Sequence, residues 1–168
     1  VASVRHYLPT TQVRGPLDVR ALLVDVAAAT RPLARMRAMQ ETKQVSVVMK
    51  MDDRITVNGS ALELREALIN LIINSIDAMP DGGRLTVRIA EDHARERIVA
   101  AVEDTGCGIP PELQAQVFEP FFTTKDPGAG TGLGLALVFS IMDDMGGSVS
   151  VTSPLYDGPN PGARFSLE

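Results

Sequence analysis

The sequence predicts an α+β fold: a two-layer α/β sandwich whose mixed, mostly antiparallel sheet of about five strands is covered on one face by about three helices. Segments with helical periodicity alternate along the chain with segments rich in β-branched residues, which indicates a mixed architecture. Residues 84–91 and 97–104 alternate polar and apolar side chains on either side of a polar connection, which is typical of an antiparallel hairpin. The chain has 168 residues, 45% of them hydrophobic, so it can form one domain with a substantial core.

Composition argues against several classes of protein. The net charge is −5 and the basic residues are scattered, so we expect no nucleic-acid partner. The chain has no apolar run of about 18 residues and no signal peptide, so we expect no direct membrane contact. Its single cysteine, Cys107, excludes an internal disulfide and fits a reducing, cytoplasmic compartment. The chain begins without methionine and stops at Glu168 inside an expected strand, so we expect a piece of a longer parent, whether or not that parent is anchored in a membrane.

The N-terminal residues are expected to lie outside the domain. Residues 1–16 show weak patterning and are interpreted as a linker or as the end of an upstream dimerisation helix, which leaves 17–168 for the domain. A helix is expected to open at Asp18, its N-cap. Pro32 should kink or restart this helix, which should end near Glu41.

The rest of the chain alternates strands, helices and loops. The most apolar helix is expected at residues 60–79, directly after an Asn58-Gly59 turn. Residues 118–132, here called the lid loop, lack periodicity, and a loop of this length in a compact domain is usually a lid or a binding loop. The other expected elements are strands at 44–51, 55–58, 148–152 and 163–168, a short helix at 112–117 and a helix at 133–145.

Helix 60–79 carries two stripes of different character. Ser60 and Glu63 are expected to form a capping box at its start. An apolar stripe should be buried, whereas a polar stripe contains two asparagines, which are poor residues for a helix interior. The polar stripe is either a solvated face or a face turned toward a ligand. The apolar stripe comprises Leu64, Leu68, Leu71, Ile72, Ser75 and Met79, and the polar stripe comprises Glu66, Asn70, Asn74 and Asp77.

A first glycine-rich turn follows the second strand of the expected hairpin. Asp104 ends the strand, and Gly106 and Gly108 follow at alternate positions. Glycines let a flat ligand approach the backbone closely, and the carboxylate can accept a hydrogen bond from an exocyclic amine such as that of adenine. The alternative is an ordinary turn in which Asp104 serves as a cap.

A second glycine-rich stretch closes the lid loop. Glycines alternate over residues 128–134 directly before a helix, and the free N–H groups at a helix start suit phosphate, with Lys125 adding a cation just upstream. No strand precedes the glycines, as a Rossmann fingerprint requires, and no Walker A sequence occurs. The alternative is a flexible surface loop. Within the lid loop, a satellite core that anchors the loop on the sheet is expected from Phe118, Phe121 and Phe122.

The asparagine stripe and the two glycine-rich segments together predict a Mg-ATP site without a P-loop. Asparagine amide oxygens are hard ligands that suit Mg²⁺, which usually keeps several waters and bridges phosphates. The carboxylate after the hairpin would contact adenine, and the lid loop would cover the phosphates.

With these motifs, the sequence resembles the catalytic and ATP-binding domain of bacterial sensor histidine kinases, in the superfamily shared with gyrase B, the heat-shock chaperone Hsp90 and MutL. This resemblance implies a Bergerat-type ATP-binding fold. The sequence FEPFFTTK followed by GTGLGL is most similar to that of the NtrB-type subgroup. The matching boxes are N (70–75, NLIINS), G1 (104–109, DTGCGI), F (118–122, FEPFF), G2 (130–135, GTGLGL) and G3 (162–166, GARFS).

The resemblance implies a role for each matching residue. Asn74 should ligate Mg²⁺, while Asn70 should contact phosphate or help to place the metal, and Asp104 should bind the adenine amine. Asn70 and Lys125 are the implied catalytic residues. Many members carry a basic residue at Asp77, so its phosphate contact is missing here, although the position remains in the nucleotide site. The base pocket should include Gly106, Gly108, Ile109 and Ser166, and the phosphate site should include Lys125, Gly130, Thr131, Gly132, Leu133 and Gly134.

The implied activity is transfer of the ATP γ-phosphate to a histidine outside this chain. Neither His6 nor His93 lies in a phosphoacceptor motif, so the acceptor should be on a separate dimerisation helix domain of a homodimeric parent, for relay to a response regulator receiver domain. One alternative is an ATP-hydrolysing switch of the gyrase or Hsp90 type. Those proteins use a glutamate base four residues before the metal asparagine, where this chain has Asn70. The other alternative is a non-catalytic nucleotide-binding module.

Overall fold

The computed structural model describes residues 14–41, 45–51, 55–126 and 130–168. Within these residues, helices and strands interleave along the chain. In order, the elements are β1 (Gly15–Asp18), α1 (Val19–Glu41), β2 (Val45–Met51), β3 (Thr56–Gly59), α2 (Ala61–Asp77), β4 (Gly83–Asp92), β5 (Arg97–Asp104), the 3₁₀ helix η1 (Pro111–Leu113), α3 (Gly134–Asp144), β6 (Val149–Thr152) and β7 (Ala163–Leu167).

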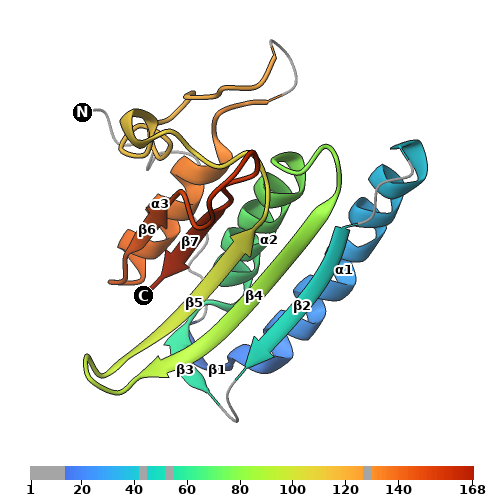
Figure 1. Cartoon of the computed structure of the whole chain (residues 1–168). Helices are drawn as coiled ribbons and strands as arrows, with labels where there is room; N and C mark the ends of the chain where they lie inside the picture. Colours follow the sequence, from blue (N-terminus) through green and yellow to red (C-terminus); the bar gives the residue numbers. More distant parts are fainter. Residues whose placement is uncertain (1–13, 42–44, 52–54, 127–129) are drawn as a thin grey trace.

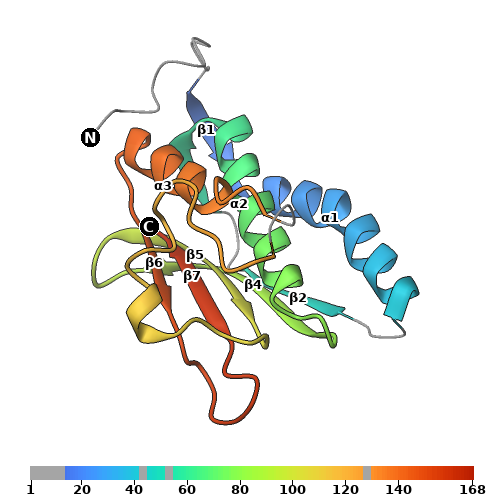
Figure 2. The same ribbon diagram turned by 90° about the horizontal axis from the view of Figure 1, so that it is seen from above.

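The main sheet has five strands in the order β2-β4-β5-β7-β6. Strand β2 runs parallel to β4, and the other neighbours are antiparallel. Helices α1, α2 and α3 cover one face of the sheet (Figures 1 and 2). The predicted two-layer α/β sandwich is therefore confirmed, as is the hairpin of β4 and β5, in which Asp92 pairs with Arg97.

A small second sheet joins the start of the described chain to the segment before α2. Its two strands are β1 and β3. Gly15 and Pro16, which were predicted to lie in the linker, pair with Gly59 and Asn58. The expected helix is therefore preceded by a short strand. Pro16 can lie in this strand because a two-stranded ladder tolerates a proline on its edge. Asp18 still caps the helix, since its Oδ1 accepts a hydrogen bond from the Ala21 N–H at 3.1 Å.

Helix α1 passes through Pro32 without restarting. Proline removes one N–H donor from a helix, and Pro32 is exposed, so water can bind the carbonyl that loses this donor. Two residues earlier, the buried Thr30 hydroxyl donates to the Val26 carbonyl at 2.9 Å. The helix ends at Glu41, as expected.

The core lies between the sheet and the inner faces of the helices. On α2, every residue of the apolar stripe is buried, and Leu68 and Leu71 have no exposed surface. They face the β5 layer, where Val102 is also fully buried. Burial of each such side chain contributes about 1.5–3 kcal/mol, so this face of α2 is fixed in rotation about the helix axis. Among the described residues, no helix combines the length and apolar character that a membrane span requires.

The sheet face opposite the helices carries ion pairs that join neighbouring strands. Glu103 on β5 is only 7% exposed, and its Oε1 binds Arg164 Nε of β7 at 2.9 Å and Arg88 Nε of β4 at 3.5 Å. Three adjacent strands are thereby linked across this face.

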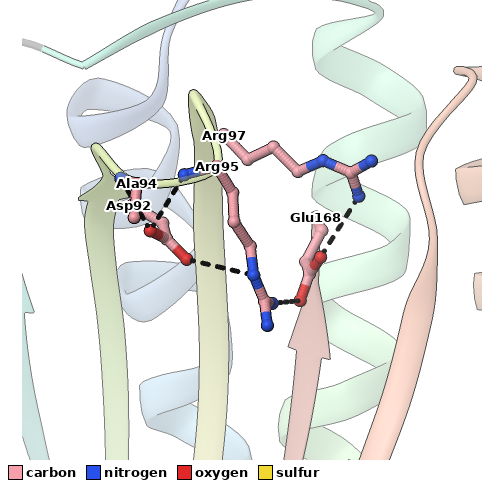
Figure 3. A network of polar contacts seen from close by, with 5 residues as sticks. All are labelled: Asp92, Ala94, Arg95, Arg97 and Glu168. Carbon is pink, nitrogen blue, oxygen red and sulfur yellow. Dashed lines mark hydrogen bonds and ion pairs between the residues drawn. The ribbon is translucent and has the colours of Figure 1, made fainter.

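A second group of ion pairs ties the end of the chain to the β4–β5 turn (Figure 3). Glu168 binds Arg97 with an Oε2–Nη1 distance of 3.3 Å and Arg95 with an Oε1–Nη1 distance of 4.0 Å. Arg95 also lies 3.8 Å from Asp92, measured from Nε to Oδ2. These side chains are partly solvated, so each pair contributes at most about 1 kcal/mol.

Candidate nucleotide-binding site

The polar stripe of α2 is turned toward other parts of the protein along most of its length. Ser60 caps the helix, and its Oγ accepts a hydrogen bond from the Glu63 N–H at 3.3 Å. Along the stripe that follows this cap, the Glu66 side chain is exposed, whereas Asn70, Asn74 and Asp77 are half-buried. The stripe is therefore not an ordinary solvated face beyond its first turn.

Both asparagines face the start of α3. A Cβ atom added to Gly134 would lie 3.1 Å from Asn70 Oδ1 and 3.7 Å from Asn74 Nδ2, so glycine permits the close approach of the two helices. The Asn70 Nδ2 donates to the Glu66 carbonyl at 3.0 Å, which leaves its Oδ1 directed at the start of α3. An amide oxygen is thus presented at a helix N-terminus.

The first turn of α3 is available to an anion. Its N-cap residue, Leu133, makes no side-chain capping hydrogen bond, in contrast to Ser60 on α2. The first N–H groups of a helix have no partners within it and carry partial positive charge. A phosphate fits this arrangement because it can accept from several of these groups at once.

A backbone hydrogen bond joins the two ends of the lid loop just before α3, and this contact is here called the lid root. The Phe121 N–H donates to the Gly132 carbonyl at 2.8 Å, and both residues have positive φ, 69° and 66°. A Cβ atom on Gly132 would overlap the Phe121 backbone. Of the expected satellite core, Phe118 packs against Phe165 with ring centroids 6.3 Å apart and Phe122 packs on the core, but Phe121 is 75% exposed. The strained Phe121 backbone turns this ring outward, which periodicity does not reveal.

Lys125 reaches α2. Its Nζ lies 2.5 Å from Asp77 Oδ2, and its backbone N–H donates to Thr123 Oγ1 at 3.2 Å. A Cβ atom on Gly130 would lie 2.9 Å from Thr123 Oγ1 and 3.1 Å from Lys125 Cδ, so Gly130 packs against this segment. Thr131 lies next to it, and its Oγ1 accepts from the Leu133 N–H at 3.4 Å. The structure therefore places Lys125 beside the polar stripe of α2, in an ion pair with Asp77.

Asp104 forms the other end of the site. It is 2% exposed, and its Oδ1 accepts hydrogen bonds from the Gly106 N–H at 2.9 Å and the Ala163 N–H at 3.3 Å. Burial raises the pKa of this carboxyl above its ordinary value, and the hydrogen bonds from the Gly106 and Ala163 N–H groups oppose the rise. A buried acceptor of this kind suits a neutral ligand that donates a hydrogen bond.

The two glycines after Asp104 allow neighbouring segments of the protein to pack closely against the turn. A Cβ atom on Gly106 would overlap the Ala78 carbonyl at the end of α2, and the neighbouring Cys107 N–H donates to that carbonyl at 3.0 Å. Gly108 has φ +71°, and a Cβ atom there would lie 2.9 Å from Ser153 Oγ. The glycines therefore seat the G1 turn against α2 and the β6–β7 connection, a role that differs from the expected approach of a ligand.

Ser153 and Gln114 hold the G1 turn in place, and neither role was predicted from the sequence. Ser153 Oγ accepts from the Ile109 N–H at 2.9 Å and donates to the Gly162 carbonyl at 2.7 Å. Gln114 Nε2 donates to the Ser153 carbonyl at 2.6 Å and to the Ile109 carbonyl at 3.1 Å. The lone Ser153 after a short strand has no sequence signature. A Gln114 in a turn likewise gives no signal.

Ser166 does not lie in the base pocket, which corrects the expectation. Side chains alternate along β7, so Ala163, Phe165 and Leu167 are buried toward the helices. Ser166 points to the other face, where it pairs with Ala101 and Ser150. The β7 residue that reaches Asp104 is Ala163, through its backbone N–H.

Comparison with known proteins agrees with this geometry. Residues 59–168 match the family described as histidine kinase-, DNA gyrase B-, and HSP90-like ATPase. The chain belongs to this ATPase family. It is 40% identical over 128 residues to sensor kinase CckA of Brucella abortus, covering 67% of this chain and 14% of that protein. It is 35% identical over 156 residues to sensor histidine kinase Hik2 of Synechocystis, covering 87% of this chain and 35% of that protein.

A solved structure of full-length ShkA in complex with AMPPNP is similar to this ATPase-family chain. The TM-score is 0.77 at 26% identity, and the match covers 95% of this chain and 31% of ShkA. The chain thus spans a minor part of each of these longer proteins.

The donor set of the ATPase-family site suits a cation that arrives with phosphate. The described residues hold no group of three or more His, Cys, Asp or Glu that could bind a metal alone. Asn70 and Asn74 instead offer amide groups beside an uncapped helix start. Such a set fits Mg²⁺ whose remaining ligands are water and phosphate oxygens.

The raised pKa of Asp104 predicts how stability depends on pH. A group whose pKa is higher in the folded state stabilises that state at low pH, and this contribution is lost as the pH rises through the folded-state pKa. The Asp104→Asn variant lacks this titration. The free energy of unfolding of the unaltered chain, minus that of the variant, is therefore expected to fall as the pH rises above the ordinary aspartate pKa of about 4. Urea denaturation of both nucleotide-free proteins measures it, and a constant or rising difference contradicts the assignment.

Proposed function

We propose that this chain is the ATP-binding catalytic domain of a sensor histidine kinase. It would transfer the γ-phosphate of Mg-ATP to a histidine on a separate dimerisation domain of a homodimeric, cytoplasmic or membrane-anchored parent, for relay to a response regulator. The observation that carries the proposal is the juxtaposition of Asn70 and Asn74 with the uncapped start of α3. Family membership supports it, as do relatives that are themselves sensor kinases.

In the proposed complex, each part of the site binds one part of the nucleotide. The adenine amine would donate a hydrogen bond to Asp104, and the phosphates would accept hydrogen bonds from the N–H groups in the first turn of α3. Asn74, with help from Asn70, would hold the cation, which would supply positive charge to the phosphates. Lys125 supplies the remaining positive charge at the γ-phosphate.

The residues of this chain support transfer of phosphate better than hydrolysis. In phosphoryl transfer, positioning and charge stabilisation do most of the work. The incoming histidine nitrogen forms the new bond to phosphorus while the bond to the bridging oxygen of ADP breaks. Hydrolysis requires a base that activates water, and Asn70 cannot accept a proton. Glu66 lies one turn earlier and is exposed to solvent, so it does not replace that base.

The acceptor domain has an apolar surface available beside the phosphate end of the site. Phe121, Leu133 and Phe139 are 75%, 42% and 49% exposed. Phe121 and Leu133 flank the lid root, and Phe139 lies on α3 next to Phe118, with ring centroids 6.3 Å apart. Exposed apolar side chains that lie together in this way commonly mark a protein–protein contact site.

The proposal is tested by phosphate transfer from [γ-³²P]ATP. The chain alone is expected to remain unlabelled, because the exposed His93 lies in the β4–β5 turn, about 23 Å along β5 from Asp104; His6 lies outside the described residues. Adding the parent's dimerisation domain should produce an acid-labile label on that domain only. Steady release of phosphate without the acceptor would favour the hydrolase, and binding without transfer or release would favour the non-catalytic module.

A further inference from the structure

Lys125 of the lid loop forms an ion pair with Asp77 of α2, an acid that has no role in the proposed reaction. We infer that Asp77 is a positioning residue, which holds the Lys125 ammonium group where the terminal phosphate of the nucleotide binds. This inference rests on the proposed function, because it needs a nucleotide triphosphate at the start of α3.

Asp77 is well placed to fix the lysine relative to the asparagines. It lies three residues after Asn74 on the same helix, so the two side chains project from the same face one turn apart. Its Oδ2 is 2.5 Å from Lys125 Nζ. The side chain of Asp77 is 14% exposed and that of Lys125 is 35% exposed, so water screens this pair less than a surface pair.

The lysine is also fixed from the lid side. Its backbone N–H is bound by Thr123 Oγ1 at 3.2 Å, and its aliphatic stem packs against Gly130. Two residues after Gly130, the Gly132 carbonyl binds the Phe121 N–H at 2.8 Å. Both the backbone and the ammonium group of Lys125 are therefore held before any nucleotide binds, which lowers the entropy cost of using it as a ligand.

We expect Lys125 to contact Asp77 and the phosphate at the same time and not to leave Asp77 for the phosphate. An ammonium group has three donors, and Asp77 occupies one of them, so others remain for phosphate oxygens. Pulling the lysine away would remove a charged partner from a carboxylate that is mostly buried, which is costly. The nucleotide-bound state that keeps the Asp77 contact and adds a phosphate contact avoids this cost.

The test compares ATP with ADP, because only ATP has the phosphate that Lys125 is inferred to meet. Isothermal titration calorimetry with Mg²⁺ would measure both dissociation constants for the unaltered chain and for Asp77→Asn, Lys125→Met and the double variant. Lys125→Met is expected to weaken ATP binding about ten- to hundredfold, as for loss of a charge-assisted hydrogen bond, and to weaken ADP binding much less. The ratio of the dissociation constant for ATP to that for ADP is here called the ATP/ADP ratio. Lys125→Met should raise this ratio, and Asp77→Asn should raise it by a smaller factor.

Two features separate positioning from other roles. In the Lys125→Met background, Asp77→Asn should leave the ATP/ADP ratio unchanged, and Asp77→Glu, which keeps the charge, should restore part of the ratio in the otherwise unaltered chain. Asp143→Asn removes the same charge at the exposed, C-terminal end of α3 and is the matched control, with no expected change in the ratio.

Three outcomes would overturn the inference. Tighter ATP binding by Asp77→Asn would show that the acid repels or competes with phosphate. A lower melting temperature with an unchanged ATP/ADP ratio would show a structural role alone. An equal effect of Asp77→Asn with and without Lys125 would show that the acid does not act through the lysine. If the unaltered chain bound no ATP, the proposed function itself would fail, and the inference with it.

Discussion

Replacing Asp104 with asparagine is expected to weaken ATP binding by about two orders of magnitude, because a buried donor would then face the adenine amine. Both backbone N–H groups at this carboxylate bind Oδ1, so the amide oxygen of the variant must take that place. The amide nitrogen then occupies the position of Oδ2. Calorimetric titration with Mg-ATP would measure the loss.

A change of base and a neighbouring control make this test specific. Inosine triphosphate carries an oxygen where adenine carries its amine, so the Asp104→Asn variant should prefer it to ATP, the reverse of the unaltered chain. Glu103→Gln neutralises the adjacent acid, which is also buried but faces the opposite side of the sheet. This control should retain ATP affinity, whereas equal losses in both variants would indicate general destabilisation and contradict the assignment.

Gly132→Ala is expected to have a comparably large effect on the lid root. The new Cβ atom would overlap the backbone of Phe121, and a backbone cannot move aside as a flexible side chain can. Relief of the overlap requires breaking the hydrogen bond between the Phe121 N–H and the Gly132 carbonyl. We expect ATP affinity to fall at least about tenfold, with the loss again measured by calorimetry.

Gly146→Ala is the matched control for this substitution. Gly146 also has positive φ, +77° against +66° for Gly132, but no atom lies within 4 Å of its added Cβ. Alanine there should cost about 1–2 kcal/mol of stability from backbone strain alone and leave ATP affinity unchanged. If Gly132→Ala behaved in the same way, the contact at the lid root would have no role in nucleotide binding.

The parts of the site predicted from sequence are those with a local pattern. The spacing of Asn70 and Asn74 places them on one helix face, and the position of Asp104 at a strand end places it at the edge of the sheet. Such features depend on helical and strand periodicity within a single element, which the chain shows without ambiguity. The five-stranded sheet and the three helices could be predicted for the same reason.

The features that sequence reasoning missed depend on contacts between distant segments. Ser153 acts on Ile109, which is 44 residues away, and Lys125 meets Asp77 across 48 residues. Ser166 was misplaced because the phase of β7 relative to β5 is set by their pairing, and a shift of one residue exchanges the two faces of a strand. Strand β1 was missed because four residues that include a proline carry little strand pattern.

The small ladder of β1 and β3 also has a mechanical consequence. The pair Gly15↔Gly59 lies at one end of the ladder, where the chain enters β1 and also leaves β3 toward Ser60 and α2. Tension between the residues before Gly15 and helix α2 would therefore load the hydrogen bonds of this ladder one after another, as in opening a zipper. Ladders pulled in this direction yield at low force, whereas ladders pulled lengthwise resist with all their bonds together. Such tension would therefore first separate Gly15 from Gly59, and the Asp18↔Thr56 pair at the other end of the ladder would separate last.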